Sequence, residues 1–142
     1  MVWGADWQHY SSTEEAFFYY DAESITHSSN DIVTVSEKRV YADDGINFMA
    51  VNLGGKYKDL HHGVCVYEVN CKDKTSRRVS LMHYTEDGTV IYSSDRQSEW
   101  RCISPRSLHV RLHEILCEQR LKEKVMEEEK LDPIETVPSK NF

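Results

Sequence analysis

The stretch from Ser98 to Cys117 divides the chain into two parts with different residue patterns. Before it, short runs of β-branched and aromatic residues are separated by turn residues, which is typical of strands. Within it, Pro105 and Ser107 indicate the start of a helix. Apolar residues then recur with the helical period at Leu108, Leu112, Ile115 and Leu116. Several strands followed by one helix predict an antiparallel α+β domain.

Six strands are expected ahead of this stretch. Their ranges are Trp3–Tyr10, Phe17–Asp21, Asp31–Tyr41, Gly63–Cys71, Thr75–Glu86 and Thr89–Ser93. Asp87-Gly88 indicates a two-residue hairpin turn, which needs positive φ at both turn positions. That turn would place Tyr84 opposite Ile91 and His83 opposite Tyr92. Both faces of the hairpin carry apolar groups and one helix covers only one face, so the second is a candidate partner surface.

The chain between residues 42 and 62 admits two interpretations. The spacing of Ile46, Met49, Ala50 and Leu53 favours a short helix, whereas the glycines around it favour a long loop. The C-terminal helix is expected over about residues 106–130, because Asp132-Pro133 cannot continue it. We therefore predict one domain over residues 1–131, with about six strands in one sheet and this helix packed on one face. Residues 132–142 are expected to form a flexible tail.

Length and charge exclude several classes of protein. A chain of 142 residues suits one domain with one modest core. The net charge of -7 argues against a nucleic-acid partner, and no apolar run is long enough to span a membrane. The chain also starts without the basic and apolar regions of a signal peptide. It is therefore either a cytoplasmic protein or an exported chain from which the leader has been removed.

The spacing of four cysteines limits how they can pair. Cys65 and Cys71 would lie about 20 Å apart on one strand, and Cys102 and Cys117 about 16 Å apart along the helix. A disulfide needs Cα atoms within about 7 Å, so pairing inside either segment is disfavoured. Pairing between strand and helix remains, and we favour Cys71–Cys117 with Cys65–Cys102 as a candidate second bridge. Four buried thiols or a zinc site are the alternatives.

Histidines provide further candidate metal ligands. His109 and His113 stand four residues apart, a spacing that can hold a metal ion on one side of a helix. Val110 stands where the zincin pattern needs a glutamate, so an ordinary helix face is the simpler interpretation. The sequence contains no phosphate loop, nucleophile elbow or dinucleotide fingerprint. We therefore predict no enzyme activity, no catalytic residues and no cofactor.

Aromatic residues concentrate near the start of the chain. Trp3, Trp7 and Tyr10 are followed by the aromatic run Phe17–Tyr20. Tryptophan and tyrosine dominate interface hot spots, but a small sheet also buries them against its helix. Core packing is the favoured interpretation of the group, and Trp3, Trp7 and Tyr10 are the candidates for a binding face.

Four short motifs occur in order between residues 5 and 117. They are Ala5-Asp6-Trp7; Tyr19-Tyr20-Asp21 followed by Ser24-Ile25; Asn70-Cys71 with Arg77-Arg78 leading to Asp87-Gly88; and Trp100, Ile103, Pro105 and Ser107 ahead of the helix that reaches Cys117. Their order and spacing resemble the surface-adhesin protein E family of small exported bacterial proteins.

This resemblance implies an antiparallel sheet with a C-terminal helix lying on it, tied down by a disulfide between Cys71 and Cys117. It also implies a periplasmic or cell-surface location, and a homodimer as a candidate assembly. The chain departs from the family at Ser36, where a tryptophan is common, and in the additional Cys65 and Cys102.

Two hypotheses about function follow. The leading one is a non-enzymatic exported binding or structural domain, adhesin-like, with an unidentified protein partner. The alternative is a metal- or thiol-dependent redox protein that uses Cys65 and Cys102 together with His109 and His113.

Overall fold

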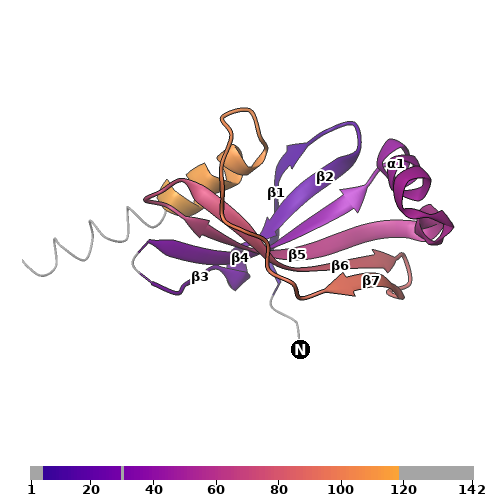
Figure 1. The fold of residues 1–142 in the computed structure, drawn as a ribbon, viewed down its shortest axis with the longest axis horizontal. Helices are drawn as coiled ribbons and strands as arrows, with labels where there is room; N and C mark the ends of the chain where they lie inside the picture. The colour runs from indigo at the N-terminus through magenta and orange to yellow at the C-terminus, as the bar shows by residue number, and fades with distance from the viewer. Residues whose placement is uncertain (1–4, 30, 119–142) are drawn as a thin grey trace, which may run out of the picture.

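The computed structural model describes residues 5–29 and 31–118. Its main feature is an antiparallel sheet with the strand order β1-β2-β4-β5-β6-β7, in which β3 pairs with β4 and β8 pairs with β6 (Figure 1). The strands are β1 (Trp7–Ser12), β2 (Ala16–Asp21), β3 (Thr26–His27), β4 (Ile32–Tyr41), β5 (Leu60–Asn70), β6 (Thr75–Thr85), β7 (Val90–Ser94) and β8 (Arg101–Cys102). The helical elements are η1 (Ala22–Ser24), α1 (Asp43–Leu53), η2 (Gly55–Asp59) and a C-terminal helix over residues 109–118. The predicted α+β fold with one antiparallel sheet is confirmed.

The six expected strands form with shifted ends. β1 starts at Trp7 instead of Trp3, which lies outside the described residues, and β5 starts at Leu60 instead of Gly63. The sequence analysis missed β3 and β8, because a strand of two residues is too short to show alternation.

Alternation along the strands gives the sheet one buried face, which we call the inner face. The residues buried on it are Val33, Val35 and Glu37 of β4 and Cys65, Tyr67 and Val69 of β5. Leu112 and Leu116 of the C-terminal helix join the same core, and each is 1% exposed. The predicted packing of this helix on one face of the sheet is confirmed, and we call the opposite side the outer face.

A disulfide joins Cys71, directly after β5, to Cys117 of the C-terminal helix, with Cα atoms 5.6 Å apart. The predicted Cys71–Cys117 bridge is therefore confirmed. The two cysteines are 46 positions apart, and closing a loop of that length is worth about 4 kcal/mol in the chain-entropy model.

The candidate second bridge is wrong, because Cys65 and Cys102 are free thiols. Cys65 pairs with Leu81 near one end of β6, whereas Cys102 pairs with Thr75 at the other end. Six residues of extended chain, about 20 Å, therefore separate the two thiols.

Residues 43–53 form α1, so the helical interpretation of this part of the chain holds. Gly54 ends the helix with a φ of 115° and donates a hydrogen bond to the Ala50 carbonyl oxygen. Gly45 lets the helix approach the loop between β1 and β2, because a Cβ there would lie 2.3 Å from the Glu15 carbonyl oxygen. Figure 1 shows α1 and the C-terminal helix near opposite ends of the strands.

The register of the β6–β7 hairpin differs from the prediction at one of two positions. His83 lies opposite Tyr92 as expected, but Tyr84 lies opposite Val90 instead of Ile91. A register shift between His83 and Tyr84 separates the two pairs.

A longer loop than the sequence analysis assumed places Tyr84 opposite Val90, and the register shift, which leaves Ile91 as an extra residue, then returns His83 to Tyr92. The Gly88 N–H donates to the Thr85 carbonyl oxygen at 3.1 Å, and the Thr85 N–H donates to the Thr89 carbonyl oxygen at 2.9 Å. Gly88 has a φ of 91°, which is typical of a type I turn followed by a glycine bulge. Three residues, not two, therefore connect the strands.

The C-terminal helix begins at residue 109, later than expected. Ser107 Oγ does not cap it but donates to the Ser104 carbonyl oxygen at 3.0 Å, and Ser104 Oγ accepts from the Arg106 N–H at 3.3 Å. The expected continuation to residue 130 and the tail at 132–142 lie outside the described residues. Within the described ranges, no helix is long and apolar enough to cross a membrane.

Candidate functional site

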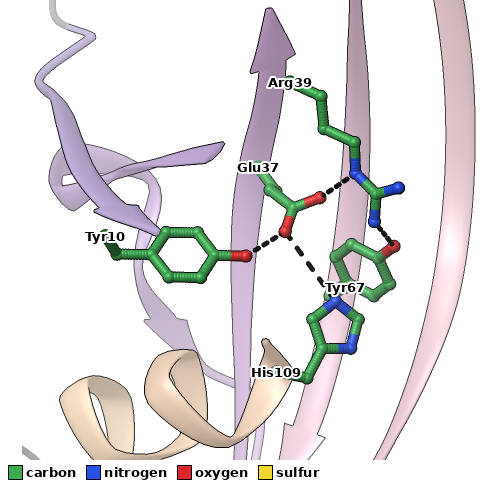
Figure 2. A network of polar contacts seen from close by, with 5 residues as sticks. All are labelled: Tyr10, Glu37, Arg39, Tyr67 and His109. Atoms are coloured by element: carbon green, nitrogen blue, oxygen red, sulfur yellow. Dashed lines mark hydrogen bonds and ion pairs between the residues drawn. The ribbon is translucent and has the colours of Figure 1, made fainter. Parts of the chain in front are cut away.

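A buried carboxylate lies at the centre of the inner face. Glu37 of β4 is 0% exposed and receives hydrogen bonds from a side chain of β1 and from one of β4 itself (Figure 2). Tyr10 of β1 donates its hydroxyl to Glu37 Oε2, and Arg39 donates Nε–H to Glu37 Oε1 at 2.8 Å. The carboxylate is therefore both ion-paired and hydrogen-bonded, as a buried charge requires.

The contacts continue from Arg39 to the C-terminal helix. Arg39 Nη2 donates to Tyr67 Oη at 2.9 Å, and the Tyr67 ring meets His109 edge-on with centroids 4.6 Å apart. His109 Nε2 lies 3.7 Å from Glu37 Oε2, too far for a hydrogen bond but within ion-pair distance when the imidazole is protonated. Figure 2 shows these side chains converging from three strands and the helix, and we call them the inner network.

Burial and charge fix the protonation of the inner network. Burial raises the pKa of Glu37, but His109, Arg39 and Tyr10 outweigh it and hold that pKa below its usual range. Burial, followed by the nearby carboxylate, raises the pKa of Tyr10, and burial also raises the pKa of Tyr67. The site therefore contains an ionised carboxylate that accepts from one neutral phenol, Tyr10, and an arginine that donates to a second, Tyr67, an arrangement suited to joining elements of the fold.

The sequence analysis missed most of this network and misjudged one member. Tyr10 was a candidate for an exposed binding face, but it is buried and its hydroxyl is used by Glu37. Trp7 is half-buried with Lys38 Nζ 5.5 Å from its ring centroid, and Trp3 lies outside the described residues. The alternation of β4 could have revealed Glu37, since it falls on the same face as Val33 and Val35.

The motif before the C-terminal helix has structural contacts. Ile103 packs against the core, and its N–H donates to the Lys74 carbonyl oxygen at 3.0 Å. Trp100 is exposed, and the Arg77 guanidinium lies 4.7 Å from its ring centroid. Pro105 and Ser107 lie at the surface in the turn before the helix.

The fold does not bring all four proposed redox residues together, although Cys102 and His109 line one hollow. Burial raises the pKa of the Cys65 thiol to about 11, and Cys102 lies at the other end of β6. His109 faces Glu37, whereas His113 lies near the backbone of Cys71. Over residues 5–29 and 31–118, no three histidine, cysteine or acidic side chains are grouped to hold a metal ion.

The outer face of the sheet carries two rows of side chains that cross four strands. The first outer row is Phe17, Val40, His62 and Tyr84, and the second outer row is Tyr19, Lys38, Val64 and Met82. Phe17 is 45% exposed and the others are half-buried. Because α1 and the C-terminal helix both contact inner-face residues, neither helix covers these rows.

Ring and cation contacts organise the outer rows. His62 stacks on Tyr84 with ring centroids 4.9 Å apart and planes 18° from parallel. Lys38 lies over Trp7, which adds a second aromatic group beside the second outer row. Aromatic side chains on a flat sheet face are the composition that protein interfaces favour.

A protein-family comparison matches residues 7–118 with the family described as surface-adhesin protein E. The chain belongs to this family. The match coincides with the resemblance expected over residues 5–117. A comparison with curated protein sequences gives no match.

Two solved structures of Haemophilus influenzae protein E are similar to this member of the adhesin E family. The first has a TM-score of 0.54 at 14% identity and covers 86% of this chain and 89% of its own. The second, crystal form II, has a TM-score of 0.53 at 11% identity and covers 84% of this chain and 91% of its own. At such identities the likeness shows a shared fold.

Proposed function

We propose that this protein is an exported, non-enzymatic binding module that engages a protein partner through the outer rows of its sheet. The uncovered outer face carries the proposal, because its aromatic and aliphatic side chains are already ordered across four strands. An interface of this kind needs no rearrangement of the sheet before it binds.

Family membership and the disulfide support the cellular setting. The family is described as a surface adhesin, so we propose a periplasmic or cell-surface location and a partner on a host surface. The Cys71–Cys117 bridge fits export, because disulfides persist in oxidising compartments and are rare in the cytosol.

The charges of the outer rows suggest the chemistry of the partner. Lys38 brings a positive charge to the second outer row, and neither row contains an acidic side chain. This composition contrasts with the chain's net charge of -7. We propose a partner surface that combines apolar groups with carboxylates, which would pair with Lys38.

A pair of phenylalanine variants tests this proposal. Labelled protein is added to cultured epithelial cells, and bound label is measured by flow cytometry. Phe17→Ser should weaken binding by about tenfold or more, as removal of an interface anchor does. Phe48→Ser is the matched control, because Phe48 is 57% exposed on α1 and lies away from the outer face.

Several outcomes would contradict the proposal. One is that the wild-type protein does not bind to the cells. Another is that Phe17→Ser and Tyr84→Ser bind as well as the wild type while both variants keep their melting temperatures. Sedimentation tests the alternative that the outer face binds a second copy of the chain. A dimer that Phe17→Ser dissociates, with cell binding unchanged, would assign the outer rows to self-association.

A further inference from the structure

A second surface feature lies on the inner face, away from the outer rows. Between α1 and the ends of β4, β5 and β6 there is a hollow of about 330 Å³. Its wall includes Phe48 and Leu53 of α1, Leu81 and Arg78 of β6, and Arg39 of β4. A volume of this size lies in the range of small-molecule sites. We call it the α1 hollow.

One side of the α1 hollow is apolar and open to solvent. Phe48 is 57% exposed and Leu53 is 54% exposed, although both line the hollow together with Met49 and Leu81. Large apolar side chains that are exposed around a concave site mark a place where an apolar group can bind.

The other side of the hollow carries two guanidinium groups, and the acidic residue Glu15 lines the hollow as well. Glu37 neutralises Arg39, but among the described residues no carboxylate forms an ion pair with Arg78. Arg78 Nε is buried without a hydrogen-bond partner. A buried donor without an acceptor is costly, so the position favours an incoming anion.

The charges of the two arginines also act on a buried histidine of the hollow. His83 lines the hollow beside the two arginines and is 4% exposed. Burial first, and then the charges of Arg39 and Arg78, lower its pKa to about 4. At neutral pH the imidazole is therefore uncharged, and the guanidinium groups define the charge of this side.

We propose that the α1 hollow binds a small amphipathic carboxylate, with the carboxylate beside Arg78 and the hydrocarbon chain against Phe48, Leu53 and Leu81. One ligand of this class would satisfy the unpaired donor and cover the exposed apolar wall together. A medium-chain fatty acid such as octanoate has both parts of this ligand class and serves as its representative. This site is separate from the proposed adhesive face.

Isothermal titration calorimetry with three probes tests the ligand class. Octanoate should bind, whereas acetate lacks the chain and octan-1-ol lacks the charge, so each should bind about tenfold more weakly or not at all. Acetate binding as well as octanoate would overturn the proposal in favour of a simple anion site. Failure of octanoate to bind below its micelle-forming concentration would overturn it entirely.

Two pairs of variants locate the site. Arg78→Gln should weaken octanoate binding about tenfold and leave octan-1-ol binding unchanged, because it removes the charge only. Arg77→Gln is the matched control, since Arg77 pairs with Glu68 and does not line the hollow. Equal effects of the two arginine variants would contradict the assignment.

For the apolar side, Phe48→Ser should weaken octanoate binding, whereas Val51→Ser should not. Val51 is 83% exposed on the same helix but does not line the hollow. Phe17→Ser should retain octanoate binding while losing cell binding, so failure of one proposal leaves the other intact. Circular dichroism on each variant confirms that the fold is kept.

Discussion

His109 Nε2 lies 3.7 Å from Glu37 Oε2, so the C-terminal helix places an imidazole against the most deeply buried carboxylate of the sheet. Eight residues further along the same helix, Cys117 is bonded to Cys71. At 1.5 Å per residue these two attachments stand about 12 Å apart along the helix axis. The helix is therefore held at two points, one electrostatic and one covalent, with Leu112 and Leu116 packed near them.

Replacement of Glu37 should destabilise the protein strongly. Glu37→Gln removes the only ionic partner that the described residues give Arg39 and weakens the fully buried contacts of Glu37, which should cost about 3–5 kcal/mol of unfolding free energy. Glu68→Gln is the matched control, since Glu68 also pairs with an arginine on the sheet but is partly exposed, and should cost less than about 1 kcal/mol. Urea denaturation at pH 7 measures both, and equal costs would contradict the role of the inner network.

The same carboxylate predicts how stability changes with acid. Folding lowers the pKa of Glu37 below its ordinary value of 4.5, so the unfolded chain takes up a proton first as the pH falls. Its stabilisation is present above pH 4.5 and is lost as the pH falls through the folded pKa. Glu37→Gln should therefore show a flatter stability profile below pH 4.5 than the wild type.

His83 should cause a separate loss of stability on acidification, in a pH range above that of Glu37. Its pKa falls from 6.5 to about 4 on folding, so the folded state keeps the imidazole neutral where the unfolded chain protonates it. Full stability is present above pH 6.5, and about 3 kcal/mol should be lost as the pH falls to 4. His83→Gln should remove most of this slope, as measured by urea titrations in steps between pH 4 and 7. An unchanged slope would show that folding does not lower the pKa of His83.

The sheet could be predicted well because most of its strands are recognisable from local sequence patterns. β4 and β5 contain enough β-branched residues over ten or eleven positions to be recognised without tertiary information. Cysteine spacing favoured a bridge between strand and helix, and the family resemblance implied the pair Cys71–Cys117. The hairpin register was half wrong, because the choice between a two- and a three-residue loop at Gly88 depends on hydrogen bonds that the sequence does not state.

The inner network and the α1 hollow could not be predicted in the same way. Tyr10, Glu37 and Tyr67 come from three strands, and their contact depends on the strand order and on the register. The hollow also depends on α1, and the sequence did not decide whether this part of the chain is a helix or a loop. The alternation along β4 could indicate that Glu37 points inward, but the local sequence does not identify the side chains that contact it.

Loss of the disulfide should have a large effect, and loss of a free thiol a small one. Cys117→Ser should lower the unfolding free energy by about 2–5 kcal/mol, as removal of a native bridge does in small exported domains. Cys102→Ser, at an exposed free cysteine, should change it by less than about 0.5 kcal/mol. Thermal unfolding of oxidised protein provides the comparison. A Cys117→Ser variant with a wild-type melting temperature would contradict a stabilising bridge.

Replacement of Gly45 should displace α1 from the sheet. A Cβ at this position would lie 2.3 Å from the Glu15 carbonyl oxygen, which is backbone and cannot rotate away as a side chain can. Gly45→Ala should therefore cost about 1–3 kcal/mol, as overpacking at a close contact does. Gly55→Ala is the matched control, because a Cβ there meets nothing within 4 Å and its φ is not in the left-handed region. Chemical denaturation followed by circular dichroism should separate the two. Since α1 forms one wall of the hollow, Gly45→Ala should also weaken octanoate binding, whereas Gly55→Ala should leave it unchanged.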